Sequence, residues 1–213
     1  MNDKQKVFCI GMNKSGTTSL QTLLSDHGYT IGNQLEGEML LKNFENMENG
    51  TIKAYFSKCD AHQDVPCSLP NFYKRLDHIF PNSKFILTIR DNPEIWYNSL
   101  ISFHTKIFSS TDSLPTFSDL MNSTYCYKGW IVDCMKVIFN YPTIPLYDKT
   151  EYIATYSNHT KAVKEYFLSK PKQLLILNLS EKNGVENISN FLGIKLLKNY
   201  KMPWLNRGID VKI

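Results

Sequence analysis

The chain has 213 residues, of which 42% are hydrophobic and 21% are charged, a composition typical of a folded globular domain rather than a disordered or fibrous chain. Its formal net charge is +4, and the lysines are scattered, which argues against a nucleic-acid partner. The five cysteines lack C-x-x-C spacing, so the sequence predicts neither a disulfide framework nor a metal site. We expect one domain over residues 1–213.

The sequence shows no sign of membrane attachment. Only a four-residue apolar run follows the first six residues, which is too short for the hydrophobic core of a signal peptide. No window reaches the ~18 apolar residues of a membrane-spanning helix. We therefore expect a cytoplasmic protein with no membrane partner.

The first predicted elements are a strand, a glycine-containing turn and a helix. Residues 7–10 are uniformly apolar, as in a strand buried on both faces of a parallel sheet. Leu20, Leu23 and Leu24 then recur at helical spacing. Residues 11–18 lie between them and hold two glycines, a lysine and several hydroxyls. A helix that begins there directs unpaired N–H groups at the turn, which predicts a phosphate site.

The turn departs from the nucleotide P-loop, G-x-x-x-x-G-K-[ST]. Gly11 and Gly16 have the P-loop spacing, but Thr17 follows Gly16 and the only lysine, Lys14, lies inside the loop. A lysine placed for the β and γ phosphates of a nucleoside triphosphate is therefore missing. The string KSGTTSL at residues 14–20 resembles the 5'-phosphosulfate loop of sulfotransferases, which use 3'-phosphoadenosine 5'-phosphosulfate (PAPS) as sulfuryl donor and release adenosine 3',5'-bisphosphate (PAP).

This resemblance implies an α/β, three-layer P-loop-like fold with a central parallel sheet flanked by helices. It implies that Lys14 contacts the oxygen that bridges phosphate and sulfate, and that the reaction needs no metal. The donor-binding residues that it implies at this loop are Lys14, Ser15, Gly16, Thr17, Thr18 and Ser19.

Candidates for the general base lie in the next third of the chain. Cytosolic sulfotransferases carry a histidine before Leu-Pro; here Asp64 occupies the comparable place, ahead of Leu-Pro at 69–70, and is the first candidate. His62 and Asp60 are alternatives, since a histidine titrates near neutrality whereas an aspartate must be desolvated. In an extended segment all three side chains would share one face. His104 is a further possible base.

A second strand-to-helix turn follows. Residues 84–89 are apolar and β-rich, which predicts a central strand that ends at Arg90. Asp91 or Asn92 is the expected N-cap of the next helix, with Pro93 at its first position. Two such turns at the same edge of a parallel sheet form the crevice in which ligands of open α/β sheets bind. The apolar residues that follow at helical spacing are Trp96, Leu100, Phe103 and Ile107.

The string ILTIRDNPEIWYNSL strengthens the resemblance. Sulfotransferases bind the 3'-phosphate of the donor with an arginine at a strand end and a serine in the next helix, which implies Arg90 and Ser99. The family places this serine eight residues after the arginine, where the chain has Asn98. Arg207, beside a glycine, resembles a further 3'-phosphate ligand of cytosolic members. The forked donors of arginine suit a phosphate dianion.

The rest of the chain is less patterned. Residues 117–139 predict one or two aromatic-rich helices, which are either core or walls of the acceptor pocket. The equivalent region of sulfotransferases, about residues 108–147 here, is a variable lid over the acceptor. The remaining segments predict a strand over 29–33, helices over 36–46, 69–80, 148–169 and 185–192, and a strand over 174–179.

The sequence therefore predicts in-line sulfuryl transfer. Asp64 or His62 would take a proton from an acceptor hydroxyl or amine, and Lys14 would stabilise charge on the leaving oxygen. The acceptor is a small molecule or a glycan, and sugar, lipid, phenol and peptide stay open. Two rival hypotheses are a P-loop kinase, in which Lys14 reaches a γ-phosphate and Asp91 holds magnesium, and a nucleotide-binding protein without chemistry.

Overall fold

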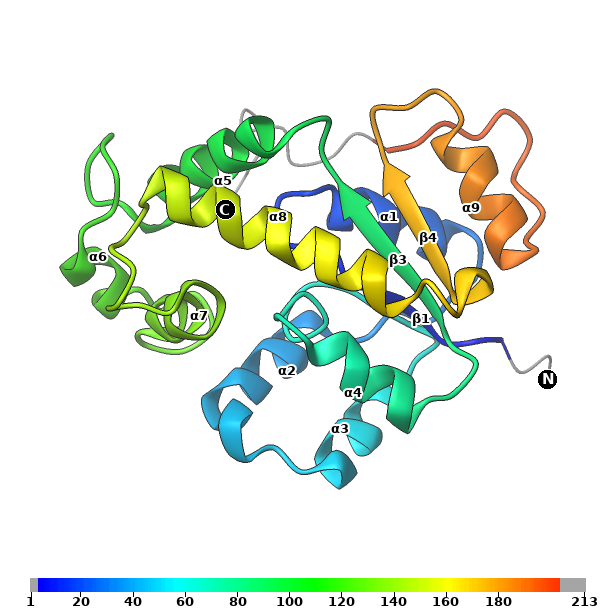
Figure 1. Ribbon diagram of the computed structural model, residues 1–213, viewed down its shortest axis with the longest axis horizontal. Helices are drawn as coiled ribbons and strands as arrows, with labels where there is room; N and C mark the ends of the chain where they lie inside the picture. Colours follow the sequence, from blue (N-terminus) through cyan, green and yellow to red (C-terminus); the bar gives the residue numbers. More distant parts are fainter. Residues whose placement is uncertain (1–3, 204–213) are drawn as a thin grey trace.

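The fold is taken from a computed structural model, in which residues 4–203 are described (Figure 1). Its sheet has four parallel strands in the order β2-β1-β3-β4. These strands are β1 (Val7–Cys9), β2 (Ala61–His62), β3 (Lys84–Ile89) and β4 (Leu174–Asn178). The helices are α1 (Thr17–Asp26), α2 (Gln34–Met39), α3 (Asn49–Phe56), α4 (Phe72–Ile79), α5 (Pro93–Phe108), α6 (Phe117–Asn122), α7 (Trp130–Phe139), α8 (Lys149–Tyr166) and α9 (Gly184–Leu192), with 3-10 helices at Leu40–Asn46 and Pro171–Gln173.

The apolar first strand supplies both faces of the sheet because successive side chains of a strand point in opposite directions. Val7 and Cys9 pack in one buried cluster with the leucines of α1 and with Ile188 of α9. Phe8 packs in the other cluster, with residues of α4 and α8. The uniformly apolar run is thus explained by burial on both sides.

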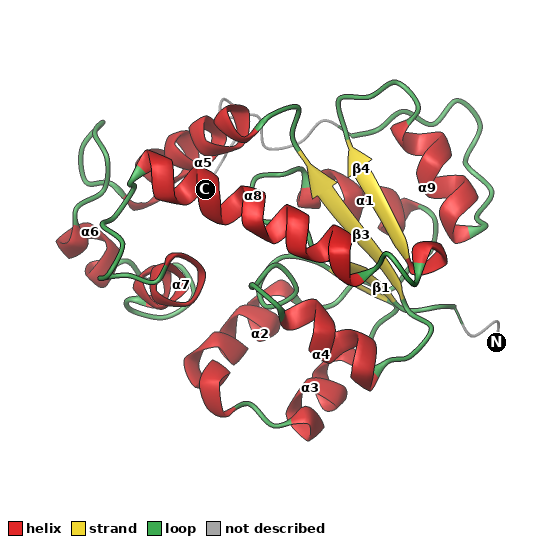
Figure 2. Ribbon diagram, in the orientation of Figure 1, coloured by secondary structure: helices red, strands yellow, loops and turns green. Residues whose placement is uncertain are grey.

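The molecule has three layers, with this sheet between two layers of helices (Figure 2). The long helix α8 crosses one face, and α3 and α4 extend the same layer, while α1 and α9 cover the opposite face. Helices α5, α6 and α7 lie beyond the carboxyl ends of the strands, on the left in Figure 1. The predicted three-layer P-loop-like α/β fold is confirmed.

The second strand-to-helix turn forms as predicted. Strand β3 has the expected bounds, and the helix after it begins at Pro93. Asn92 is its N-cap, and its side-chain oxygen accepts a hydrogen bond from the N–H of Ile95 at 2.9 Å. The cap satisfies one of the unpaired N–H groups of the helix. Arg90 therefore lies at the carboxyl edge of the sheet.

Two predicted elements differ in the structure. Residues 29–33 do not form a strand; only Ile31 bridges to Ala61, because Asn33 already caps helix α2 through the N–H of Glu36. The predicted helix over 36–46 divides into α2 and a 3-10 helix, and Asn43 inside it has a non-helical φ of −123°. Short segments such as these are decided by packing rather than by local pattern.

A close approach between β1 and β3 requires glycine at position 11. A Cβ atom on Gly11 would collide with both the hydroxyl and the backbone carbonyl of Thr88. We expect Gly11→Ala to lower the free energy of unfolding by about 2 kcal/mol, which in a domain of this size lowers Tm by ~4–8 °C. Thermal denaturation followed by circular dichroism measures this change.

Gly50→Ala is the matched control for Gly11→Ala. No atom lies within 4 Å of a Cβ at Gly50, and this residue is in the first turn of α3. Alanine there should leave Tm unchanged or slightly raised, because alanine has the higher helix propensity. Equal Tm values for the two variants would contradict the proposed steric role of Gly11.

Candidate active site

A cavity of about 830 Å³ lies at the carboxyl edge of the sheet. Because the strands are parallel, the segments that leave β1, β2 and β3 emerge side by side there. The first contributes the loop with Lys14, the second Asp64 and the third Arg90, and all three residues line the cavity. Helices α2, α5, α6 and α7 supply the remaining walls.

The loop after β1 is held against the sheet by Ser15. Its N–H donates to the carbonyl of Met12 at 3.1 Å, and its hydroxyl lies 2.6 Å from the hydroxyl of Thr88 on β3. Gly16 follows with φ 105°, a left-handed conformation that favours glycine. Helix α1 then begins without a side-chain cap, and Thr17 lines the cavity. The amino terminus of the helix is thus directed at the cavity, an arrangement that suits an anion.

Lys14 and Arg90 form one basic wall of this cavity. The Nζ of Lys14 lies 4.1 Å from the ring centroid of Phe103. The guanidinium Nε of Arg90 donates to the backbone carbonyl of Lys14 at 2.8 Å. Burial, together with the nearby charge of Arg90, lowers the pKa of Lys14 to about 8. Two cations held this close together favour a polyanionic ligand.

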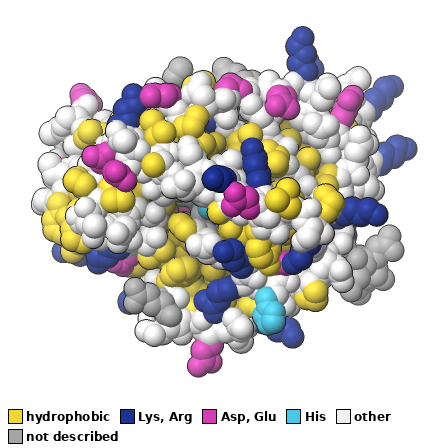
Figure 3. All heavy atoms as spheres, in the orientation of Figure 1, with side chains coloured by type: hydrophobic (Ala, Val, Ile, Leu, Met, Phe, Trp, Pro, Cys, Tyr) yellow, Lys and Arg dark blue, Asp and Glu magenta, His cyan; other side chains and the backbone are white. Residues whose placement is uncertain are grey.

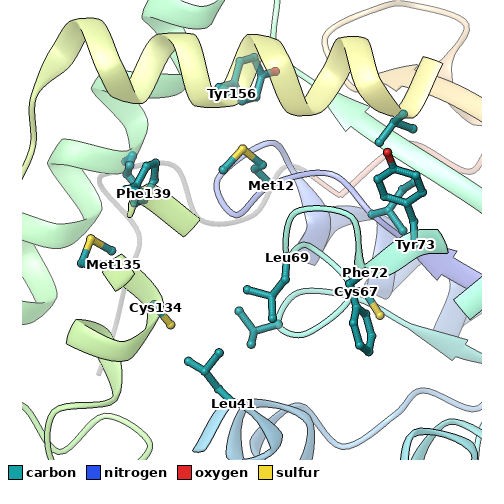
Figure 4. Close-up of a cluster of buried hydrophobic side chains, with 14 of the residues drawn as sticks. Met12, Leu41, Cys67, Leu69, Phe72, Tyr73, Cys134, Met135, Phe139 and Tyr156 are labelled. Atoms are coloured by element: carbon teal, nitrogen blue, oxygen red, sulfur yellow. The ribbon is translucent and has the colours of Figure 1, made fainter. Parts of the chain in front are cut away.

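Aromatic side chains hold this wall in place. The N–H of Arg90 donates to the hydroxyl of Tyr156 on α8 at 2.9 Å, and the Tyr156 ring stacks on Trp96 of α5 at 4.5 Å. The indole N–H of Trp96 donates to the carbonyl of Asn13 in the loop at 2.9 Å. Figure 4 shows Tyr156 on α8 above Met12 of the same loop. The end of β3 and the loop are therefore fixed to α5 and α8.

Asp64 is half-buried and enters the cavity from a left-handed backbone conformation, with φ 64°. Its Oδ1 accepts a hydrogen bond from the N–H of Val65 at 3.0 Å, and the side chain of Asn13 also bonds to it. Ser68 in turn donates to Asn13 Oδ1 at 3.0 Å. Burial raises the pKa of Asp64 to about 6. A carboxylate with this pKa is ionised at neutral pH and still basic enough to take a proton.

The structure separates Asp64 from the other two candidates on its segment. His62 lies in an aromatic cluster with Phe8 and Phe56, and its Nε2 is 3.1 Å from the carbonyl oxygen of Phe56. Burial lowers its pKa to about 4. Asp60 accepts hydrogen bonds from the N–H and hydroxyl of Thr30. Neither residue lines the cavity. The expectation that all three share one face is wrong, because β2 ends at His62 and the backbone turns at Asp64.

His104 lines the cavity from α5 but is buried. Its Nδ1 lies 3.2 Å from the hydroxyl of Tyr147. Burial and the charge of Lys14 lower its pKa to about 3. This imidazole is therefore neutral and a weaker base than Asp64.

The structure brings together some of the predicted donor residues and leaves others outside the cavity. The hydroxyl of Ser15 faces β3, and Ser19 is buried within α1. Neither Ser99 nor Asn98 lines the cavity. Ser99 lies one helical turn before Phe103, which does line it, whereas Asn98 is exposed. Arg207 lies outside the described residues. The predicted donor residues that line the cavity are Lys14, Gly16, Thr17, Thr18 and Arg90, and the predicted base Asp64 lines it with them.

Sequence reasoning missed Glu38 of α2. Its side chain lines the cavity although the residue is only 3% exposed. Gln34 donates to its Oε1 at 2.9 Å, and the indole N–H of Trp130 donates to its backbone carbonyl at 3.2 Å. Burial, with a smaller contribution from the charge of Asp64, raises the pKa of Glu38 to about 7. Nothing in the local sequence marks this residue, because its surroundings come from distant segments.

The far part of the cavity is apolar. Trp130, Met135 and Phe139 of α7 are buried and also line it, so this region is both core and pocket wall. Figure 4 shows Met135 and Phe139 to the left of Met12 of the loop. Exposed Phe117 and Met121 of α6 lie next to residues of the cavity lining, and Figure 3 shows hydrophobic side chains over this end of the molecule.

Comparison with known families identifies the chain. The sequence profile described as "Sulfotransferase domain" matches residues 6–211. The chain belongs to the sulfotransferase family. No curated protein sequence matches it.

A solved sulfotransferase structure resembles this chain in fold. A sulfotransferase from Alicyclobacillus acidocaldarius matches with a TM-score of 0.54 and 13% identity, over 90% of this chain and 82% of that one. A shikimate kinase from Bacteroides thetaiotaomicron matches with a TM-score of 0.43 and 11% identity, over 89% of this chain and 98% of that one. Within residues 4–203, no helix is long and apolar enough to cross a bilayer.

Proposed function

We propose that this sulfotransferase transfers a sulfuryl group from PAPS to a hydroxyl or amine of a small-molecule or glycan acceptor by in-line displacement. One observation supports this most directly. Two cations, Lys14 and Arg90, and one carboxyl, Asp64, line the same cavity from three adjacent strand ends. Such an arrangement suits a polyanionic donor on one side and a proton acceptor on the other.

Different groups of the chain would bind different parts of the donor. Backbone N–H groups at the start of α1 would bind the 5'-phosphate, and Gly16 adopts the left-handed conformation that precedes this helix start. Lys14 would contact the oxygen that bridges phosphate and sulfate. The guanidinium of Arg90 would bind the 3'-phosphate through its forked donors. The donor supplies a sulfuryl group already attached to a good leaving group.

Asp64 would act as the general base. It takes the proton from the acceptor atom while that atom forms a bond to sulfur and the bond from sulfur to the bridging oxygen breaks. Lys14 stabilises the negative charge that develops on this oxygen. Asn13, which bonds to Asp64 and is itself bonded by Ser68, holds the carboxylate in position.

The structure offers the kinase hypothesis no comparable support. Asp91, the residue that would hold magnesium, accepts hydrogen bonds from Asn178 and Ser180 at 2.6 Å each. Asp91 does not line the cavity.

Ligand-induced melting shifts test the donor assignment. We expect PAP to raise Tm more than AMP or ATP with Mg²⁺, because only PAP carries the 3'-phosphate that Arg90 would bind. Arg90→Ala should weaken PAP binding by about 10- to 100-fold, the effect of losing a charge-assisted contact. AMP binding should change little in the same variant. Equal shifts with PAP and AMP, or a larger one with ATP and Mg²⁺, would contradict the assignment.

Transfer of labelled sulfate from PAPS to an acceptor panel tests the chemistry separately. Sulfation of any acceptor by the wild-type protein supports the proposed activity. Strong PAP binding without transfer to any acceptor would favour the hypothesis of a binding protein without chemistry.

A further inference from the structure

Besides Asp64, the cavity lining contains two carboxyl groups that the proposed reaction does not use, Glu38 and Asp119. Only 3% of the surface of Glu38 is exposed, yet the residue lines the cavity. Its Oε1 accepts from the neutral amide of Gln34. In the described part of the chain, no hydrogen bond is made to its Oε2, and no lysine or arginine pairs with it. A buried carboxylate without a cation is costly, so this group favours a ligand that brings one.

The charges of the cavity lining also favour a ligand that carries a positive charge. Lys14 and Arg90 are the cations of its lining, and the proposed function commits both to the phosphates and sulfate of the donor. With these two neutralised, the carboxyls that remain in the lining are Glu38, Asp64 and Asp119, and Asp119 already accepts hydrogen bonds from the N–H and the hydroxyl of Thr116. Glu38 and Asp64 are close enough that the charge of Asp64 raises the pKa of Glu38. Opposite charge in the acceptor would relieve this repulsion.

Aromatic rings lie beside Glu38. The indole of Trp130 is bonded to the backbone of Glu38 at 3.2 Å, and the Tyr125 ring stacks on it with centroids 5.2 Å apart. Both residues line the cavity. The faces of such rings attract ammonium groups, and their area suits an apolar substituent. A carboxylate next to aromatic walls is therefore suited to an amine with an apolar body.

We propose, resting on the function proposed above, that the acceptor is an apolar primary amine and that Glu38 binds its ammonium group beside Asp64. Sulfation of an ammonium must release two protons, whereas sulfation of a hydroxyl releases one. Glu38 and Asp64, two of the three carboxyls in the cavity lining, can take them.

The steps balance in atoms and charge. Glu38 accepts one proton from R–NH₃⁺, which leaves a neutral amine with a free electron pair. That pair forms the N–S bond while the bond from sulfur to the bridging oxygen breaks, and its electrons leave with PAP. Asp64 accepts the second proton from nitrogen. The product is the sulfamate R–NH–SO₃⁻, and both carboxyls then return their protons to water.

A matched pair of probes tests this acceptor class. Isothermal titration of the PAP-loaded protein with 2-phenylethylamine and with 2-phenylethanol compares an amine and an alcohol of the same shape. We expect the amine to bind at least about tenfold more tightly. Glu38→Gln, in which the side-chain oxygen can still accept from Gln34, should remove this preference and leave binding of the alcohol within about twofold.

Glu36→Gln is the control, since it makes the same chemical change on the same helix. Glu36 is exposed, pairs with Lys58 and does not line the cavity, so this variant should retain the preference for the amine. The melting shift with PAP verifies that each variant is folded. Equal binding of amine and alcohol, no binding of the amine, or an unchanged preference in Glu38→Gln overturns the inference. If the wild-type protein does not bind PAP, that result would instead overturn the proposed function.

Discussion

Replacing Lys14 by Ala is expected to reduce kcat by about 100-fold or more, the usual effect of removing a group that stabilises developing charge. PAP affinity should fall far less, because loop N–H groups and Arg90 still bind the phosphates. The position of Lys14 supports this split: its amine reaches the cavity, while its carbonyl accepts from Arg90 at 2.8 Å and is kept in the variant. Single-turnover rates with PAPS and calorimetric PAP affinities provide the measurement.

Lys106→Ala is the control for this experiment, because Lys106 is an exposed lysine of α5 that does not line the cavity. It should retain both activity and affinity. Lys14 has φ 70°, so melting temperatures must accompany the kinetic data to verify folding. Equal losses of turnover and PAP binding in Lys14→Ala would argue against a role in the transition state.

Replacing Asp64 by Asn is expected to lower kcat by about 10²- to 10⁴-fold, the range for loss of a general base. It should also change the pH profile of kcat/KM. In the wild-type protein this parameter should rise through pH about 6, because Asp64 must lose its proton before it can act as a base. It should fall above pH about 8, because Lys14 must keep its proton. With an alcohol acceptor, which leaves no ammonium proton for Glu38 to accept, the variant should lose the acidic limb.

Asp60→Asn separates the two aspartates of this segment. Asp60 bonds to Thr30 and does not line the cavity, so the variant should keep the activity and the pH profile of the wild-type protein. A large loss in Asp60→Asn with normal PAP binding, or a retained acidic limb in Asp64→Asn, would assign the base elsewhere.

The local sequence by itself determined the framework of the site. The apolar run of β1, the two glycines after it and the helix of leucines predicted an anion-binding turn, and the strand that ends at Arg90 predicted the neighbouring wall. These predictions rest on interactions within a few residues of each other. Buried parallel strands need uninterrupted apolar sequence, and helix starts need glycine, proline or capping residues, so the signal is local and strong.

Only the tertiary structure decided what surrounds that framework. The alternation of Asp60, His62 and Asp64 favoured one shared face, but His62 packs against Phe56 and only Asp64 reaches the cavity. Glu38 is part of the site because Trp130, far along the chain, packs beside it. The burial and charge that set the pKa values of these groups come from distant segments. No local pattern records such contacts, because they depend on how the helices close over the end of the sheet.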